Sequence, residues 1–176
     1  MNVTFIGMAG AGKSYYGKKL AERLNLEWVD SDVLLSEAYG GRDIQSILDE
    51  LGEEAYLREE ARVCMEAAHG RDNVLFSPGG STVYTPEWMD FMRGISKVIY
   101  LKVPYETVEA RLQKVPPRAI IGLGRKTLRE LYDERHPLYE RNAHFIVERG
   151  TRSSEGYLKA MTDFLGVDSA GASATV

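Results

Sequence analysis

Residues 7–14, Gly-Met-Ala-Gly-Ala-Gly-Lys-Ser, follow the pattern G-x-x-x-x-G-K-[ST]. In this pattern glycines let backbone N–H groups approach phosphate oxygens, the lysine reaches the outer phosphates, and the serine hydroxyl binds Mg²⁺. A helix that starts near the lysine adds the positive end of its dipole. The pattern predicts ATP and Mg²⁺ as ligands, with the nucleotide held by Gly7, Ala9, Gly10, Ala11, Gly12, Lys13, Ser14 and Tyr15. It does not by itself separate kinases from nucleotide switches or motors.

Two aspartates, Asp30 and Asp32, come directly after a short strand-like run at residues 27–29. The carboxyl ends of parallel strands meet at one edge of a sheet, so we expect both carboxylates beside residues 7–14. Phosphoryl transfer needs a carboxylate near the metal and a group that orients the attacking hydroxyl and takes its proton. We assign Asp30, with Ser14, to Mg²⁺, and Asp32 to the acceptor and to catalysis. The alternative is that residues 30–32 only cap the next helix.

A second turn, Pro78-Gly79-Gly80, ends another strand-like run and should lie at the same sheet edge. Its backbone amides could bind the acceptor or a metal-bound water. The alternative is a simple turn, and only the presence of residues 7–14 favours the binding interpretation.

Arg135 occupies a helical position four residues after Leu131 and seven after Leu128, so a guanidinium stands where the pattern expects an apolar side chain. Such an arginine needs an anionic partner. We expect a carboxylate or phosphate of the substrate, held by the planar fork of the side chain. A buried Glu or Asp of the protein is the alternative.

The elements that must position these residues alternate along the chain. Short apolar runs predict strands at residues 3–6, 27–29, 73–77, 97–103 and 143–147. Helical patterns cover residues 13–24, 31–39, 43–51, 53–69, 105–114, 125–140 and 154–165, and residues 115–124 read as a loop. Alternating strands and helices predict an α/β fold with a parallel sheet covered on both faces.

The chain has 176 residues, which suits one domain, expected over residues 1–166 with a flexible tail at 167–176. A formal net charge of -4 argues against general binding of nucleic acid. No run approaches the roughly 20 apolar residues that span a bilayer, and no leader pattern precedes the first strand. We expect a cytoplasmic protein, monomeric and without membrane association.

With these motifs the sequence resembles the shikimate kinase family, from Met1 to about Arg152. Besides residues 7–14, the matching pieces are residues 30–32, Gly52-Glu53 followed by Glu60, Gly79-Gly80, and residues 134–139, Glu-Arg-His-Pro-Leu-Tyr. The resemblance implies a three-layer α/β/α P-loop kinase fold with a five-stranded parallel sheet. It also implies a helical substrate-binding region at about residues 31–61 and a mobile lid at about 115–124.

The resemblance further implies roles for individual residues. The counterpart of Asp30 lies near Mg²⁺ and that of Asp32 contacts the acceptor hydroxyl. Arg118 resembles the catalytic lid arginine that closes over the transferred phosphate; a solvated loop arginine is the alternative. Arg111 and Arg152 resemble positions that flank the adenine.

The sequence departs from the family pattern at the acceptor site. Counting from Gly52, Tyr56 holds the place of an aromatic residue and Leu57 that of an arginine that grips the shikimate carboxylate. Arg58 comes one position late, and neighbouring helix positions point about 100° apart. Ser81 replaces the third glycine of the turn, and the lid lacks the usual Arg-Pro-Leu-Leu. We expect Leu57, Arg58, Gly79, Gly80, Ser81, Arg135 and Asp32 to line the acceptor site.

Three functions remain open from the sequence. The first is phosphorylation of shikimate to shikimate 3-phosphate by ATP. The second is a paralogue that phosphorylates another small alcohol, such as a hydroxy amino acid or a polyol acid, and Leu57 favours it. The third, a nucleotide-dependent regulatory protein, fits the paired aspartates and Arg135 poorly.

Overall fold

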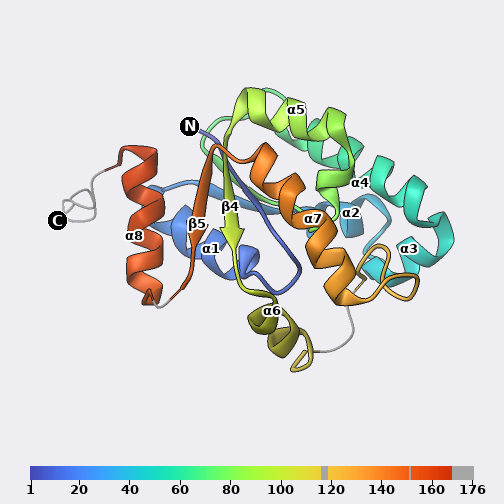
Figure 1. Ribbon diagram of the computed structural model, residues 1–176. Coiled ribbons are helices and arrows are strands. Elements are labelled where there is room, and N and C mark those ends of the chain that lie inside the picture. Colours follow the sequence, from blue (N-terminus) through green and yellow to red (C-terminus); the bar gives the residue numbers. More distant parts are fainter. Residues whose placement is uncertain (116–118, 151, 168–176) are drawn as a thin grey trace.

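The computed structural model describes residues 1–115, 119–150 and 152–167. Its centre is a five-stranded parallel sheet in the order β2-β3-β1-β4-β5 (Figure 1). The strands are β1 (Val3–Ile6), β2 (Glu27–Asp30), β3 (Val74–Ser77), β4 (Lys97–Lys102) and β5 (Phe145–Glu148). The expected five-stranded parallel sheet is confirmed. All residues of β1 and β3 are buried, as expected for central strands covered on both faces.

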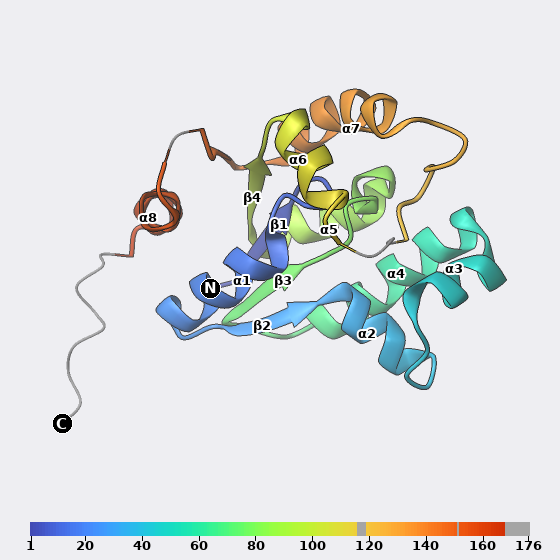
Figure 2. The ribbon, with the colours of Figure 1, turned by 90° about the horizontal axis from the view of Figure 1, so that it is seen from below.

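Helices cover both faces of this sheet. They are α1 (Lys13–Leu24), α2 (Ser31–Ala38), α3 (Ile44–Leu51), α4 (Glu53–Ala68), α5 (Pro86–Ile95), α6 (Tyr105–Leu112), α7 (Leu128–Asn142) and α8 (Ser154–Leu165), with a short 3₁₀ helix η1 (Thr82–Tyr84). Helix α1 contacts β1, β2 and β3 and packs on α8, whereas α5 and α7 contact β4 from the other face (Figures 1 and 2). The expected three layers are therefore present.

Two differences from the sequence interpretation concern the helices. Helix α5 was not predicted, although Pro86 at its first turn and buried Trp88, Met89 and Met92 give a start signal and an apolar stripe. Helix α7 begins at Leu128 rather than near residue 125, because Thr127 and Glu130 form a capping box that fixes its start.

The apolar side chains form two clusters. The larger one fills both sides of the sheet and includes Trp88, Leu20 and Phe5, each fully buried. The smaller one joins α2, α3 and α4 around Ile47 and includes Ile121, which follows the gap at residues 116–118. Each fully buried aliphatic side chain stabilises the fold by about 1.5 to 3 kcal/mol. The second cluster therefore packs the helical region against the segment that begins at residue 119. Within the described residues, no helix has both the length and the apolar character needed to span a membrane.

Candidate active site

The carboxyl ends of β1, β2 and β3 open into one cleft of about 1170 Å³. The backbone of residues 7–12 turns there into α1 through Gly12, whose φ of +100° belongs to the left-handed region that favours glycine. A Cβ on Gly7 would lie 2.9 Å from the carbonyl oxygen of Leu101 on β4. The loop is therefore built against the sheet with no room for side chains at its start.

Lys13 lies over this loop. Its Nζ donates hydrogen bonds to the carbonyl oxygens of Gly7 at 2.8 Å and Met8 at 3.1 Å. Burial lowers the pKa of Lys13 to about 8, although the nearby carboxylates of Asp32 and then Asp30 raise it. A cation held in this way at the start of a helix is suited to the outer phosphates of a nucleotide.

The two aspartates lie where β2 ends and α2 begins. The Ser14 hydroxyl donates to Asp30 Oδ2 at 2.9 Å, and Asp30 Oδ1 accepts the amide of Asp32 at 3.0 Å. Asp30 thus caps α2, as the alternative interpretation predicted. The same carboxylate also accepts a hydrogen bond from Ser14 of the phosphate loop. Asp32 lines the cleft. The expected proximity of these residues to the loop is observed.

Ser14 and Asp30 also meet the chemical requirement for Mg²⁺. Both offer oxygen ligands, and Mg²⁺ usually takes one or two protein groups together with phosphate oxygens and waters. Among the described residues, no group of three or more His, Cys, Asp or Glu is arranged as a metal site. An ion here would therefore depend on the nucleotide as well as on the protein.

The turn after β3 carries Gly79, Gly80 and Ser81, and all three line the cleft. The Gly79 amide donates to the Ser31 hydroxyl at 2.9 Å and to Glu60 Oε1 at 3.1 Å, so it is used within the protein. The Gly80 carbonyl accepts the Tyr139 hydroxyl at 2.5 Å. A ligand would therefore have to bind this turn through polar groups of the turn other than the Gly79 amide.

Glu60 was matched only as part of the family pattern, and the structure gives it a specific place beneath this turn. Its side chain is buried, and Oε1 accepts the Ser31 hydroxyl at 2.8 Å as well as the Gly79 amide. Oε2 is buried without a hydrogen-bond partner among the described residues. Burial raises the pKa of Glu60 to about 7 against the effect of the Ser31 hydrogen bond.

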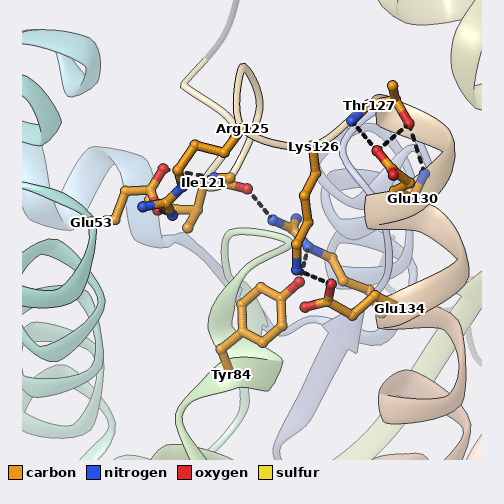
Figure 3. A network of polar contacts seen from close by, with 10 residues as sticks. Glu53, Tyr84, Ile121, Arg125, Lys126, Thr127, Glu130 and Glu134 are labelled. Atoms are coloured by element: carbon orange, nitrogen blue, oxygen red, sulfur yellow. Dashed lines mark hydrogen bonds and ion pairs between the residues drawn. The ribbon is translucent and has the colours of Figure 1, made fainter.

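Arg135 reaches the cleft from α7 and is 1% exposed. Its Nε donates to the Tyr84 hydroxyl at 3.2 Å, one terminal nitrogen donates to the Ile121 carbonyl at 2.6 Å, and the guanidinium lies 5.0 Å from the centre of the Tyr84 ring. Within the described part of the chain, no Asp or Glu forms a direct ion pair with it. Among these residues, therefore, the alternative of a buried carboxylate partner is not found. Figure 3 shows Tyr84 and Ile121 within this network of polar contacts.

The other end of the cleft differs from the expectation at one arginine. Arg111 lines it and donates to the Gly10 carbonyl at 2.8 Å, and the exposed Tyr15 also lines it. Arg152 does not line it, because its side chain turns back to the Glu148 carbonyl and is exposed. Arg149 lines the cleft instead and donates to the Tyr16 hydroxyl at 2.6 Å. Sequence spacing alone gave no signal that separates these two arginines.

The start of α4 also places its residues differently from the expectation. Tyr56 faces the cleft, whereas Leu57 is turned toward a side cavity of about 190 Å³ that it shares with Tyr84 and Ile121. Arg58 is exposed and pairs with Glu54. The steps of about 100° between neighbours explain this order, since only one of three consecutive positions can face the cleft. The structure thus does not bring Leu57 or Arg58 into the cleft. Arg118 lies outside the described residues.

The family model for shikimate kinase matches residues 9–165 of the chain. A curated shikimate kinase of Francisella tularensis subsp. novicida is 34% identical over 166 residues, which cover 93% of this chain and 94% of the relative. The chain belongs to the shikimate kinase family.

Solved shikimate kinases have the same fold. The enzyme of Bacteroides thetaiotaomicron superposes with a TM-score of 0.80 at 25% identity, covering 95% of this chain and 99% of the other. The enzyme of Acinetobacter baumannii, solved in complex with shikimate, gives 0.79 at 27% identity, covering 94% and 93%. The P-loop kinase fold and the family resemblance are confirmed. Leu57 and Ser81 are therefore departures from the family pattern within a member of the family.

Proposed function

We propose that this protein transfers the γ-phosphate of ATP to a hydroxyl of shikimate, giving shikimate 3-phosphate. The observation that carries the proposal is the joint placement of Lys13, Asp32 and Arg135 around one cleft. They provide, in that order, a cation for the phosphates, a base for the hydroxyl and a fork for a carboxylate. The names of the relatives and the solved complex with shikimate support the same substrate.

In this proposal the phosphate loop and Lys13 hold the β- and γ-phosphates, and the loop amides compensate their charge. Ser14 and Asp30 would hold Mg²⁺, which would neutralise charge on the phosphate oxygens. Arg111 and Arg149 would flank the base end of the nucleotide. Arg118 would reach the transferred phosphate.

At the acceptor end, Asp32 orients the hydroxyl and accepts its proton as the phosphoryl group arrives. Arg135 binds the carboxylate by charge-assisted hydrogen bonds, each worth about 1.5 to 3 kcal/mol. The turn at Gly79, Gly80 and Ser81 bounds the acceptor on the side of the sheet. These roles place the hydroxyl between Asp32 and the phosphate loop.

The test is ADP release by the purified protein with ATP, Mg²⁺ and millimolar shikimate. We expect shikimate-dependent turnover that Asp32→Asn reduces by about 10²- to 10⁴-fold, the usual range for a lost general base. The matched control is Asp49→Asn, the same change on α3, outside the residues that line the cleft. Absence of shikimate-dependent ADP release would refute the proposed substrate.

A second candidate is phosphorylation of a different small alcohol with one anionic group. It is favoured by Leu57, because an apolar side chain that borders the small cavity beside Tyr84 takes the place of the family's carboxylate-binding arginine. The same assay with a panel of hydroxy amino acids and polyol acids decides between the two. A higher kcat/KM for one of these than for shikimate would select it.

A further inference from the structure

Arg135 is a buried cation whose orientation is set by neutral groups. Removing a guanidinium from water costs several kcal/mol unless its N–H groups find partners. Here the Arg135 guanidinium donates to the Tyr84 hydroxyl and the Ile121 carbonyl, and the Tyr139 hydroxyl also lies near it. Tyr84 contributes twice, because its ring also lies 5.0 Å from the guanidinium carbon, within the range of a cation–π contact.

Tyr84 is itself fixed to the acceptor turn. It is the last residue of η1, and its amide donates to the Ser81 carbonyl at 3.0 Å. The Thr82 hydroxyl donates to the Gly79 carbonyl at 2.8 Å. Since the turn and Tyr84 belong to one short hydrogen-bonded segment, the position of the phenol follows that of the turn.

The carboxylate of Glu134 also lies close to the Tyr84 hydroxyl (Figure 3). The pKa of Glu134 is lowered first by its hydrogen bond with Lys126 and next by the Tyr84 hydroxyl. The Tyr84 hydroxyl thus accepts from Arg135 and also interacts with Glu134, and among the described residues Arg135 and Glu134 form no direct ion pair. A direct ion pair would occupy the guanidinium fork and cancel its charge, whereas a hydroxyl orients it and leaves the charge for a ligand.

Leu57 makes this orientation more important. Its side chain borders the small cavity beside Tyr84, so α4 supplies no second cation there. Binding of an anionic group by Arg135 then depends on how well its guanidinium is aimed. A side chain that is free to choose among rotamers would lose part of the binding energy to ordering.

We propose that Tyr84 is the positioning residue that aims Arg135 at the anionic group of the acceptor. The inference rests on the proposed function for the identity of that acceptor. It predicts that the Tyr84 hydroxyl acts on acceptor binding through Arg135 and has no effect on the nucleotide.

The first arm of the test compares Tyr84→Phe with Tyr132→Phe. The control removes a hydroxyl of the same kind, which donates to the Val103 carbonyl at 2.9 Å, from the helix that carries Arg135. We expect Tyr84→Phe to raise the KM for shikimate between about twofold and tenfold, the range for one hydrogen bond. The KM for ATP and the kcat should not change, and Tyr132→Phe should leave the KM for shikimate unchanged.

The second arm separates aiming from packing. The methyl ester of shikimate lacks the negative charge, so its KM should be the same in Tyr84→Phe and in the wild type. In an Arg135→Gln background, Tyr84→Phe should add no further increase in the KM for shikimate, because the two residues act as one unit. Equal losses with acid and ester, or additive losses in the double variant, would mean that Tyr84 is only structural.

A third measurement does not depend on turnover. The Arg135 Nε–H should be protected from exchange in the NMR spectrum of the wild type and of Tyr132→Phe, and should lose protection in Tyr84→Phe. A wild type that fails to phosphorylate shikimate would refute the proposed substrate. Normal turnover with an unchanged KM in Tyr84→Phe, or protection that persists in that variant, would refute the role of Tyr84.

Discussion

Replacing Glu60 with glutamine should remove a pH dependence from the stability of this fold. Glu60 lies on α4 with its side chain 1% exposed, and one oxygen accepts from Ser31 and Gly79 while the other has no partner among the described residues. Glutamine has nearly the same shape and keeps an acceptor for Ser31 and Gly79. It imitates the protonated acid and cannot ionise.

The sign follows from the pKa of Glu60, which burial raises to about 7 from the ordinary glutamate value of 4.5. Between these values the folded protein binds a proton that the unfolded chain has released, so stability falls as pH rises. The shift corresponds to about 3 kcal/mol in full, of which about 2 to 3 kcal/mol should be lost between pH 5 and pH 8. The loss is complete once the pH exceeds the folded pKa.

The assay is urea unfolding at pH 5, 6, 7 and 8, comparing wild type with Glu60→Gln at each pH so that other titrating groups cancel. The free energy of unfolding of the variant relative to wild type should rise by about 2 to 3 kcal/mol from pH 5 to pH 8. Glu59→Gln is the matched control, since Glu59 is paired with Arg62 and its pKa is lowered by that hydrogen bond. A difference between Glu60→Gln and wild type that stays constant with pH would show that Glu60 is ionised in the fold throughout this range.

Three further predictions concern the cleft and its surroundings. Lys13→Met should lower kcat by on the order of 10²- to 10³-fold without a matching fall in melting temperature, because burial already disfavours the ammonium; parallel losses in both measurements would contradict the role of Lys13. Tyr139→Phe should lower the free energy of unfolding by about 1 to 3 kcal/mol in urea titrations, since it leaves the Gly80 carbonyl without its hydroxyl partner, and an unchanged midpoint would contradict this. Glu53→Ala should speed amide exchange at Gly122 by about tenfold, because the carboxylate accepts that N–H at 2.8 Å and also pairs with Arg125; exchange at the wild-type rate would mean that the segment is held by Ile121 alone.

The sequence was sufficient for the features that depend on local patterns. The phosphate loop, the five strands and the placement of Asp30 and Asp32 at the end of β2 follow from short-range spacing and from the rule for parallel sheets. Arg135 was also found from sequence, because a cation on an apolar helix face is a local anomaly. In each case the relevant neighbours are a few residues apart or are fixed by the topology.

The features that sequence reasoning missed depend on contacts between distant segments. Tyr84 and Arg135 are separated by 51 positions, and nothing in either neighbourhood indicates that the phenol meets the guanidinium. The choice of Arg149 over Arg152 depends on how the chain leaves β5, and the exclusion of Arg58 depends on which side of α4 faces the cleft. Such choices are made by packing, which local propensity does not encode.

The pairing of β1 with β3 has a consequence for how such an enzyme can change its substrate. The phosphate loop leaves β1 and the acceptor turn leaves β3, and a Cβ on Gly80 would lie 3.1 Å from the Gly7 carbonyl oxygen. The distance between the phosphate loop and the acceptor turn is thus fixed by the pairing of β1 with β3, because neighbouring strands of a sheet lie about 4.8 Å apart. Substitutions on α2, α4, η1 and α7 can therefore change which alcohol fits the site. The distance over which the phosphoryl group is transferred stays the same.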